Sequence, residues 1–167
     1  MNMIKKTIFS FILLAFIIVT YAQESHYINN EHNHEHEHPK NELGISLSPV
    51  YFIEGKELSA ATHLHYVYSF TDTKFGVGLG YERILDEHKH NFVGLELNYR
   101  PIHNLTLNLS PGVAFEGDHF DEKEFAMHFE SVYEFEFESF HIGPLFELAY
   151  HPEDFHLSLG IHVGWGF

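Results

Sequence analysis

The sequence predicts an all-β fold, an antiparallel eight-stranded up-and-down β-barrel that spans a membrane. Three observations lead to this fold: repeated segments in which apolar and polar residues alternate, short turns between them, and apolar rows too bulky for a barrel interior. The last segment shows the alternation clearly, because large apolar residues occupy every second position from Phe155 to Phe167. Successive side chains of a strand point to opposite faces, so each segment has one apolar face and one polar face.

The chain begins with a segment typical of a secretory signal peptide. Lys5 and Lys6 precede an apolar run from Ile8 to Val19, and the small residue Ala22 stands at the expected cleavage point. The run is too short for a membrane-spanning helix, which needs about 20 apolar residues. We therefore expect residues 1–22 to be removed during export.

Residues 23–41 form a leader that we expect to be disordered. The leader has no apolar periodicity, so it cannot bury enough surface to order itself. Its stretch EHNHEHEHPK contains four alternating histidines, which are His32, His34, His36 and His38. Such a tract can bind a divalent metal ion near neutral pH, where imidazole is largely unprotonated. The alternative is a solvated acidic linker.

The barrel domain is predicted over residues 42–167, with eight strands. They are, in order, Leu43–Glu54, Thr62–Phe70, Phe75–Ile84, Asn91–Arg100, Leu105–Glu116, Phe125–Phe137, Phe140–His151 and Phe155–Phe167. The connections TDTK, PIHN and Glu138–Ser139 are tight turns, whereas the other connections are more polar and mostly longer. Short turns at one rim and longer loops at the other are typical of an up-and-down antiparallel barrel.

The apolar rows are predicted to face lipid. The interior of an eight-stranded barrel is only just wide enough for its side chains, and rows such as Leu64 to Phe70 would overfill it. Aromatic residues also gather near both strand ends, as in barrels that span a bilayer. These features argue against a soluble lipocalin-like barrel. Pro49, Pro111 and Pro144 lie in strand interiors on the outward rows, where we expect a bulge at one or more of them.

With these features the chain resembles the small eight-stranded outer-membrane barrels of Gram-negative bacteria, the OmpA-domain and OmpX type. The resemblance rests on the export segment, the strand count, and the terminal Phe167 that follows Trp165 on an alternating strand. It implies an outer-membrane location, contact with outer-membrane lipid, and recognition of Phe167 by the barrel-assembly machinery. Members of this family include adhesins, anchors, channels and enzymes, so the resemblance implies an architecture and no particular activity.

The predicted inward rows carry far more carboxylates than cations. Arg100 is the cation expected inside, against eight glutamates: Glu54, Glu82, Glu96, Glu116, Glu130, Glu134, Glu136 and Glu147. Unpaired buried carboxylates are costly, so they must take up protons, pair with protonated histidine, or bind metal. Imidazole and carboxylate together suit zinc, nickel, cobalt and copper.

The turn positions predict which lumenal residues face one another across hairpins. The predicted pairs are His63 with Glu82, Glu130 with Glu147, Glu136 with His141, and His151 with His156. The candidate metal ligands would then line two walls of the lumen, with His128, Glu130, Glu147, His151 and His156 on one wall and His63, His65 and Glu82 on the other. The alternative is a proton-sharing polar plug in a barrel with a structural or adhesive role. Further ligands at the rim with the longer loops would be His88, His90, Asp118, His119 and Asp121.

Several function classes are disfavoured. No motif such as G-x-S-x-G positions a catalytic nucleophile, so we expect no enzyme. The net charge of −15 argues against nucleic-acid binding, and the absence of cysteine excludes thiolate chemistry and a disulfide framework. The sequence therefore predicts a monomeric outer-membrane barrel that binds a divalent transition metal and moves or buffers it. Its partner would be a periplasmic metal-handling protein.

Overall fold

The computed structural model describes residues 39–117, 122–152 and 154–167. The predictions for the signal peptide (residues 1–22) and for His32, His34, His36 and His38 lie outside the described residues, as do those for Asp118, His119 and Asp121. No helix long and apolar enough to cross a membrane occurs in the described part of the chain.

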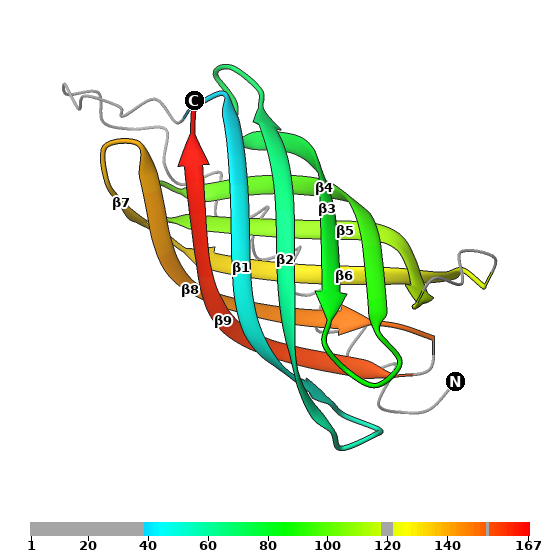
Figure 1. Ribbon diagram of the computed structural model, residues 1–167. Helices are drawn as coiled ribbons and strands as arrows, with labels where there is room; N and C mark the ends of the chain where they lie inside the picture. Colours follow the sequence, from blue (N-terminus) through cyan, green and yellow to red (C-terminus); the bar gives the residue numbers. More distant parts are fainter. Residues whose placement is uncertain (1–38, 118–121, 153) are drawn as a thin grey trace. The chain divides into compact units, whose positions relative to one another are not determined.

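The described chain forms a closed antiparallel β-barrel (Figure 1). Its strands are β1 (Asn41–Phe52), β2 (Leu58–Ser69), β3 (Phe75–Ile84), β4 (His90–Ile102), β5 (Leu105–Glu116), β6 (Glu124–Tyr133), β7 (Phe135–Glu136), β8 (Phe140–Tyr150) and β9 (Phe155–Gly166). β6 and β7 are two parts of one strand, because both pair with β8 in the same register. The pairing of β1 with β9 closes the ring, so the barrel has the predicted 8 strands in up-and-down order.

The barrel has two unlike rims. The tight turns that follow β2, β4 and β7 lie at the end that carries Phe167, which we name the C-terminal rim. The connections after β1, β3, β5 and β8 lie at the opposite end, which we name the loop rim. The last residue is fixed in place, since the backbones of Asn41 and Phe167 exchange hydrogen bonds of 3.1 and 2.9 Å. The start of β1 and the end of the chain are therefore joined at the C-terminal rim.

Burial follows the predicted alternation, and the apolar rows lie on the outside. In β1, even-numbered residues from Glu42 to Val50 are buried and the odd-numbered residues between them are exposed. Large apolar side chains in mid-strand, such as Leu79 and Leu159, are 64 % and 67 % exposed. An apolar exterior around a closed barrel suits a bilayer and would be unfavourable in water. At the C-terminal rim, Phe75 stacks on Tyr99 with ring centroids 4.9 Å apart.

The expected bulge at a proline is not present in the described strands. Pro49, Pro111 and Pro144 all face outward, but the register on either side of each is unchanged. A proline has no backbone N–H, so it cannot donate a hydrogen bond to the neighbouring strand. At these three prolines the pairing between strands is interrupted, but no extra residue is inserted. The register shifts within the described strands only between Tyr99 and Ile102, where β4 approaches its tight turn.

The buried apolar side chains form two small clusters near the loop rim, while Val67, Val132 and Leu145 are buried elsewhere along the lumen. One cluster joins Val50, Ala61 and Ile84, and a second joins Phe92, Ala114 and Ala126. These residues come from the ends of their strands that meet the loop rim. Most of the other buried side chains of the lumen are polar or charged.

Candidate metal centre in the barrel lumen

Among the described residues the lumen buries six glutamates, six histidines and a single arginine, Arg100. The buried glutamates are Glu42, Glu82, Glu96, Glu130, Glu134 and Glu147. The buried histidines are His63, His65, His128, His141, His156 and His162. One fixed cation cannot balance six carboxylates, and unpaired buried charges are unfavourable. The lumen therefore requires further positive charge, supplied by protons or by bound cations.

The prediction of inward glutamates is partly wrong. Glu54, Glu116 and Glu136 are exposed, because they lie in a turn or at strand ends where the lumen opens to the rims. Glu42 was not predicted, although it is only 3 % exposed. The predicted first strand began at Leu43, whereas β1 begins at Asn41 and places Glu42 on the inward row.

Five candidate ligands gather near the loop rim, and we name them the loop-side group. They are Glu82, His128, Glu147, His151 and His156. The Glu147 carboxylate lies between two imidazoles, with Oε2 3.5 Å from His128 Nδ1 and Oε1 3.4 Å from His156 Nε2. On the other side of its ring, His128 Nε2 lies 3.3 Å from His151 Nε2. The group contains two sets of three residues, and within each set the three ligand atoms lie within 4.8 Å of one another. One set is His128, His151 and His156, and the other is Glu82, Glu147 and His156.

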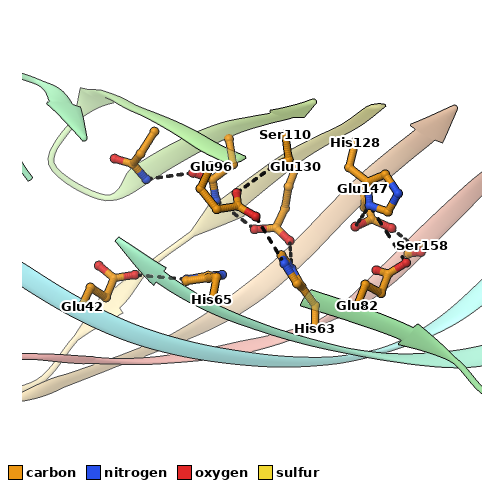
Figure 2. Close-up of polar contacts among 12 residues, drawn as sticks. Glu42, His63, His65, Glu82, Glu96, Ser110, His128, Glu130, Glu147 and Ser158 are labelled. Carbon is orange, nitrogen blue, oxygen red and sulfur yellow. Dashed lines mark hydrogen bonds and ion pairs between the residues drawn. The ribbon is translucent and has the colours of Figure 1, made fainter. Parts of the chain in front are cut away.

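Neighbouring side chains hold the loop-side group in place. Ser158 Oγ donates a 3.0 Å hydrogen bond to Glu147 Oε1 (Figure 2). The ring of Phe92 stacks on His128 with centroids 3.8 Å apart, which fixes the plane of the imidazole. Both ring nitrogens of His156 are buried without a hydrogen-bond partner. A buried polar atom without a hydrogen bond loses its hydration without full compensation, so a bound metal ion would be favourable for this ring, which already lies 3.4 Å from Glu147 Oε1 and 3.8 Å from Glu82 Oε1.

The predicted pairing of His151 with His156 is wrong by two residues. β8 ends at Tyr150, His151 N donates to Asp154 O at 2.9 Å, and His156 pairs with Ala149. The two imidazoles are still neighbours, with ring centroids 5.2 Å apart. Burial and the nearby rings of His128 and His156 lower the pKa of His151 to about 2. Its imidazole is therefore neutral at physiological pH, which is the form that binds metal.

A second set of four residues lies deeper in the lumen, and we name it the central group. It comprises His63, His65, Glu96 and Glu130. His63 bridges two carboxylates, with Nδ1 3.3 Å from Glu130 Oε2 and Nε2 3.4 Å from Glu96 Oε1 (Figure 2). The outer carboxylate oxygens accept hydrogen bonds, Glu130 from Asn108 at 3.0 Å and Glu96 from Ser110 at 2.7 Å.

The backbone pairs that the sequence predicted across hairpins are confirmed for His63 with Glu82, Glu130 with Glu147, and Glu136 with His141. The two predicted walls are nevertheless regrouped, because Glu82 joins His156 while Glu130 joins His63. Both contacts cross the lumen between strands that are not neighbours. The interior of an eight-stranded barrel is narrow enough for side chains to reach the opposite wall.

The predicted rim ligands His88 and His90 lie near acidic residues at the loop rim. His90 Nδ1 binds the Asp86 carboxylate, and His88 Nδ1 lies 3.6 Å from Glu116 Oε2. The ring of His90 is 6.4 Å from that of His151. The rim histidines thus lie next to the loop-side group without being part of it.

Comparison with known proteins gives structural likeness alone. No family model and no curated protein matches the sequence. The chain is similar to Ail, the attachment invasion locus protein of Yersinia pestis, with 13 % identity, 78 % of this chain and 100 % of that chain covered, and a TM-score of 0.55. The N-terminal β-barrel domain of Pseudomonas aeruginosa OprF gives 18 % identity, coverage of 78 % and 100 %, and a TM-score of 0.54.

A barrel designed de novo to span a membrane is also similar, with 14 % identity, 77 % and 98 % of the two chains covered, and a TM-score of 0.53. At these identities the likeness concerns the fold and says nothing of the lumenal residues. The resemblance indicated by the sequence is confirmed at this level: the chain has the fold of the small 8-strand barrels of the outer membrane.

Proposed function

We propose that this protein is an outer-membrane barrel that binds a divalent transition metal ion at the loop-side group and moves or buffers it across the outer membrane. The proposal includes export by the signal peptide, capture of metal by the His-rich tract, and a binding activity without catalysis. The excess of buried carboxylates beside buried imidazoles carries the proposal. A divalent cation would balance this charge while using the side chains as ligands.

The spacing of the ligand atoms supports the proposal. Two ligands that each lie about 2.0–2.1 Å from a tetrahedral zinc ion are roughly 3.4 Å apart. In the loop-side group, Glu147 Oε1 and His156 Nε2 are 3.4 Å apart, and the Nε2 atoms of His128 and His151 are 3.3 Å apart. Glu82 Oε1 is 3.8 Å from His156 Nε2, so a small movement would bring it to the same spacing.

Zinc or nickel titration of the purified protein in detergent tests the proposal. All five histidines of the leader (His26, His32, His34, His36 and His38) are first replaced by asparagine, so that binding reports on the barrel. Metal at about 100 times its Kd should then stabilise the barrel by about 2.7 kcal/mol in thermal or urea unfolding. Acidification from about pH 7.5 to about pH 5 should weaken binding, because protons compete with the metal for imidazole.

The double substitution Glu82→Gln and Glu147→Gln identifies the site. It removes two negative charges with little change in volume, so the metal-induced stabilisation should disappear. Glu54→Gln with Glu57→Gln is the matched control, since both glutamates are exposed at the loop rim. If metal never stabilises the barrel and Glu82→Gln with Glu147→Gln makes it more stable, the lumen is a proton-sharing plug. A structural or adhesive role would then replace the proposed one.

A further inference from the structure

A third set of ligands lies near the C-terminal rim, on the far side of the central group from the loop-side group. We propose that Glu42, His141 and His162 form a second divalent-metal site, so that one barrel holds two ions. The inference rests on the proposed function for the class of metal and goes beyond it in the number and position of the ions. The sequence had paired His141 with Glu136 across a hairpin without assigning His141 to a metal site.

The ligand atoms of the second site converge from three strands that close the barrel. Glu42 comes from β1, His141 from β8 and His162 from β9, and one ligand atom of each lies within 4.8 Å of the others. His141 Nε2 is 3.7 Å from Glu42 Oε1, and the rings of His141 and His162 have centroids 5.1 Å apart. The site therefore offers two nitrogens and one oxygen, a ligand set that suits zinc and its neighbours.

His162 gives an independent indication of a ligand at this place. Its side chain is 1 % exposed, and neither ring nitrogen has a hydrogen-bond partner. His141 Nε2 is likewise buried without one. A buried imidazole in this condition has lost its hydration without compensation, which a coordinated metal ion would restore.

Two glycines make room for the imidazoles of this site. Gly44 and Gly164 are strand partners, and Gly164 also pairs with His141. A Cβ atom on Gly44 would lie 2.2 Å from His65 Nε2 and 2.5 Å from His162 Nε2, and one on Gly164 would lie 2.3 Å from His141 Nε2. Only glycine permits such close approach of the backbone to these rings. The inward row of β1 and β9 is thus shaped around the histidines.

The second site is separate from the loop-side group and is connected to it through the lumen. In Figure 2, Glu42 and His65 lie at one end of the view, His128 and Glu147 at the other, and His63 between them. His65 Nε2 is 3.5 Å from Glu42 Oε1, and the rings of His65 and His63 have centroids 5.3 Å apart. The central group therefore lies between the two sites as a set of intermediate ligands.

Arg100 makes the second site the weaker of the two. Arg100 Nη2 binds Glu42 Oε2 at 2.5 Å, which leaves Oε1 directed toward the histidines. A fixed positive charge beside the carboxylate opposes a second cation. A weaker site near the C-terminal rim would favour release of the ion at that end of the barrel.

Counting zinc ions per barrel tests the inference. In the full chain with the leader histidines replaced by asparagine, zinc titration should give two ions per barrel, one bound more tightly than the other. His141→Gln with His162→Gln should leave one ion, the tighter, and Glu82→Gln with Glu147→Gln should leave the other. His103→Gln is the matched control at the C-terminal rim, because its side chain is 45 % exposed, and it should keep both ions.

Gly44→Ala provides a variant that removes no ligand. The added methyl group meets the far ends of the His65 and His162 rings, which can turn away, so the barrel should fold and lose the weaker ion alone. Folding of every variant is checked by the heat-dependent gel shift of a closed barrel. If the chain with the leader histidines replaced binds only one ion and loses it in Glu82→Gln with Glu147→Gln, that result would overturn the second site and leave the proposed function intact. One ion, lost only in His141→Gln with His162→Gln, would support the second site and exclude the loop-side group. No ion at all would overturn both.

Discussion

Leu159→Arg should lower the free energy of unfolding of the barrel by about 2–4 kcal/mol, because it places a charge on the lipid face near mid-strand. Leu159 lies in the middle of β9, and its side chain is 67 % exposed on the outward row. In a bilayer this exposed surface is covered by hydrocarbon, where a guanidinium cannot be hydrated. Urea unfolding in lipid vesicles measures the loss.

The same substitution at the rim is the control for depth in the bilayer. Leu58 is 75 % exposed at the start of β2, at the loop rim, so Leu58→Arg should cost only about 0–1 kcal/mol. Equally small losses for both variants would mean that the whole exterior meets water. The barrel would then be a soluble one, and the outward placement of the apolar rows would need another explanation.

The barrel architecture could be predicted from the sequence because it depends on two properties that can be assessed for each strand separately. These are the alternation of apolar and polar residues and the volumes of the side chains on each face. The predicted segments Phe75–Ile84 and Leu105–Glu116 coincide with β3 and β5. The choice of the outward face followed from the size of the apolar residues, which an eight-stranded interior cannot hold. Neither property depends on which distant strands face one another across the lumen.

The grouping of the lumenal side chains could not be predicted in this way. Hairpin turns determine the neighbours of a strand, so His63 was placed correctly opposite Glu82. The contacts of His63 with Glu130, and of Glu82 with His156, instead join strands across the lumen. They depend on the tilt and stagger of the strands, which determine the side chains that share a height within the barrel. No local pattern in the sequence encodes that height.

Small errors at strand ends had large effects on the candidate sites. A start of β1 at Asn41 brings Glu42 into the lumen, where it pairs with Arg100 and faces His141. At the other rim, an earlier end of β8 displaced His151 from its predicted partner by two residues. Strand ends are determined by turn geometry and by contacts at the rims. The alternation of apolar and polar residues does not show where a strand ends.

Arg100→Met should cost about 3–5 kcal/mol of unfolding free energy, because it leaves the buried Glu42 carboxylate without its fixed counter-charge. Arg100 is 7 % exposed, and its Nη1 also donates a 2.9 Å hydrogen bond to Ser69 Oγ. Methionine keeps much of the apolar stem, so the change acts mainly on charge. Arg100→Lys retains the charge and should cost clearly less, as measured by urea unfolding in vesicles.

A second substitution separates the charge of Glu42 from the packing of Arg100. Glu42→Gln added to Arg100→Met should recover most of the lost stability, because removing both members of a buried pair leaves no uncompensated charge. Zinc should also stabilise Arg100→Met more than the parent, since the freed Glu42 carboxylate faces His141 and His162 and no longer shares its charge with a guanidinium. If Arg100→Met instead costs less than about 1 kcal/mol without metal, Glu42 is already neutralised by protons. The lumen would then balance its charge as a plug does, and the second metal site would lose its electrostatic basis.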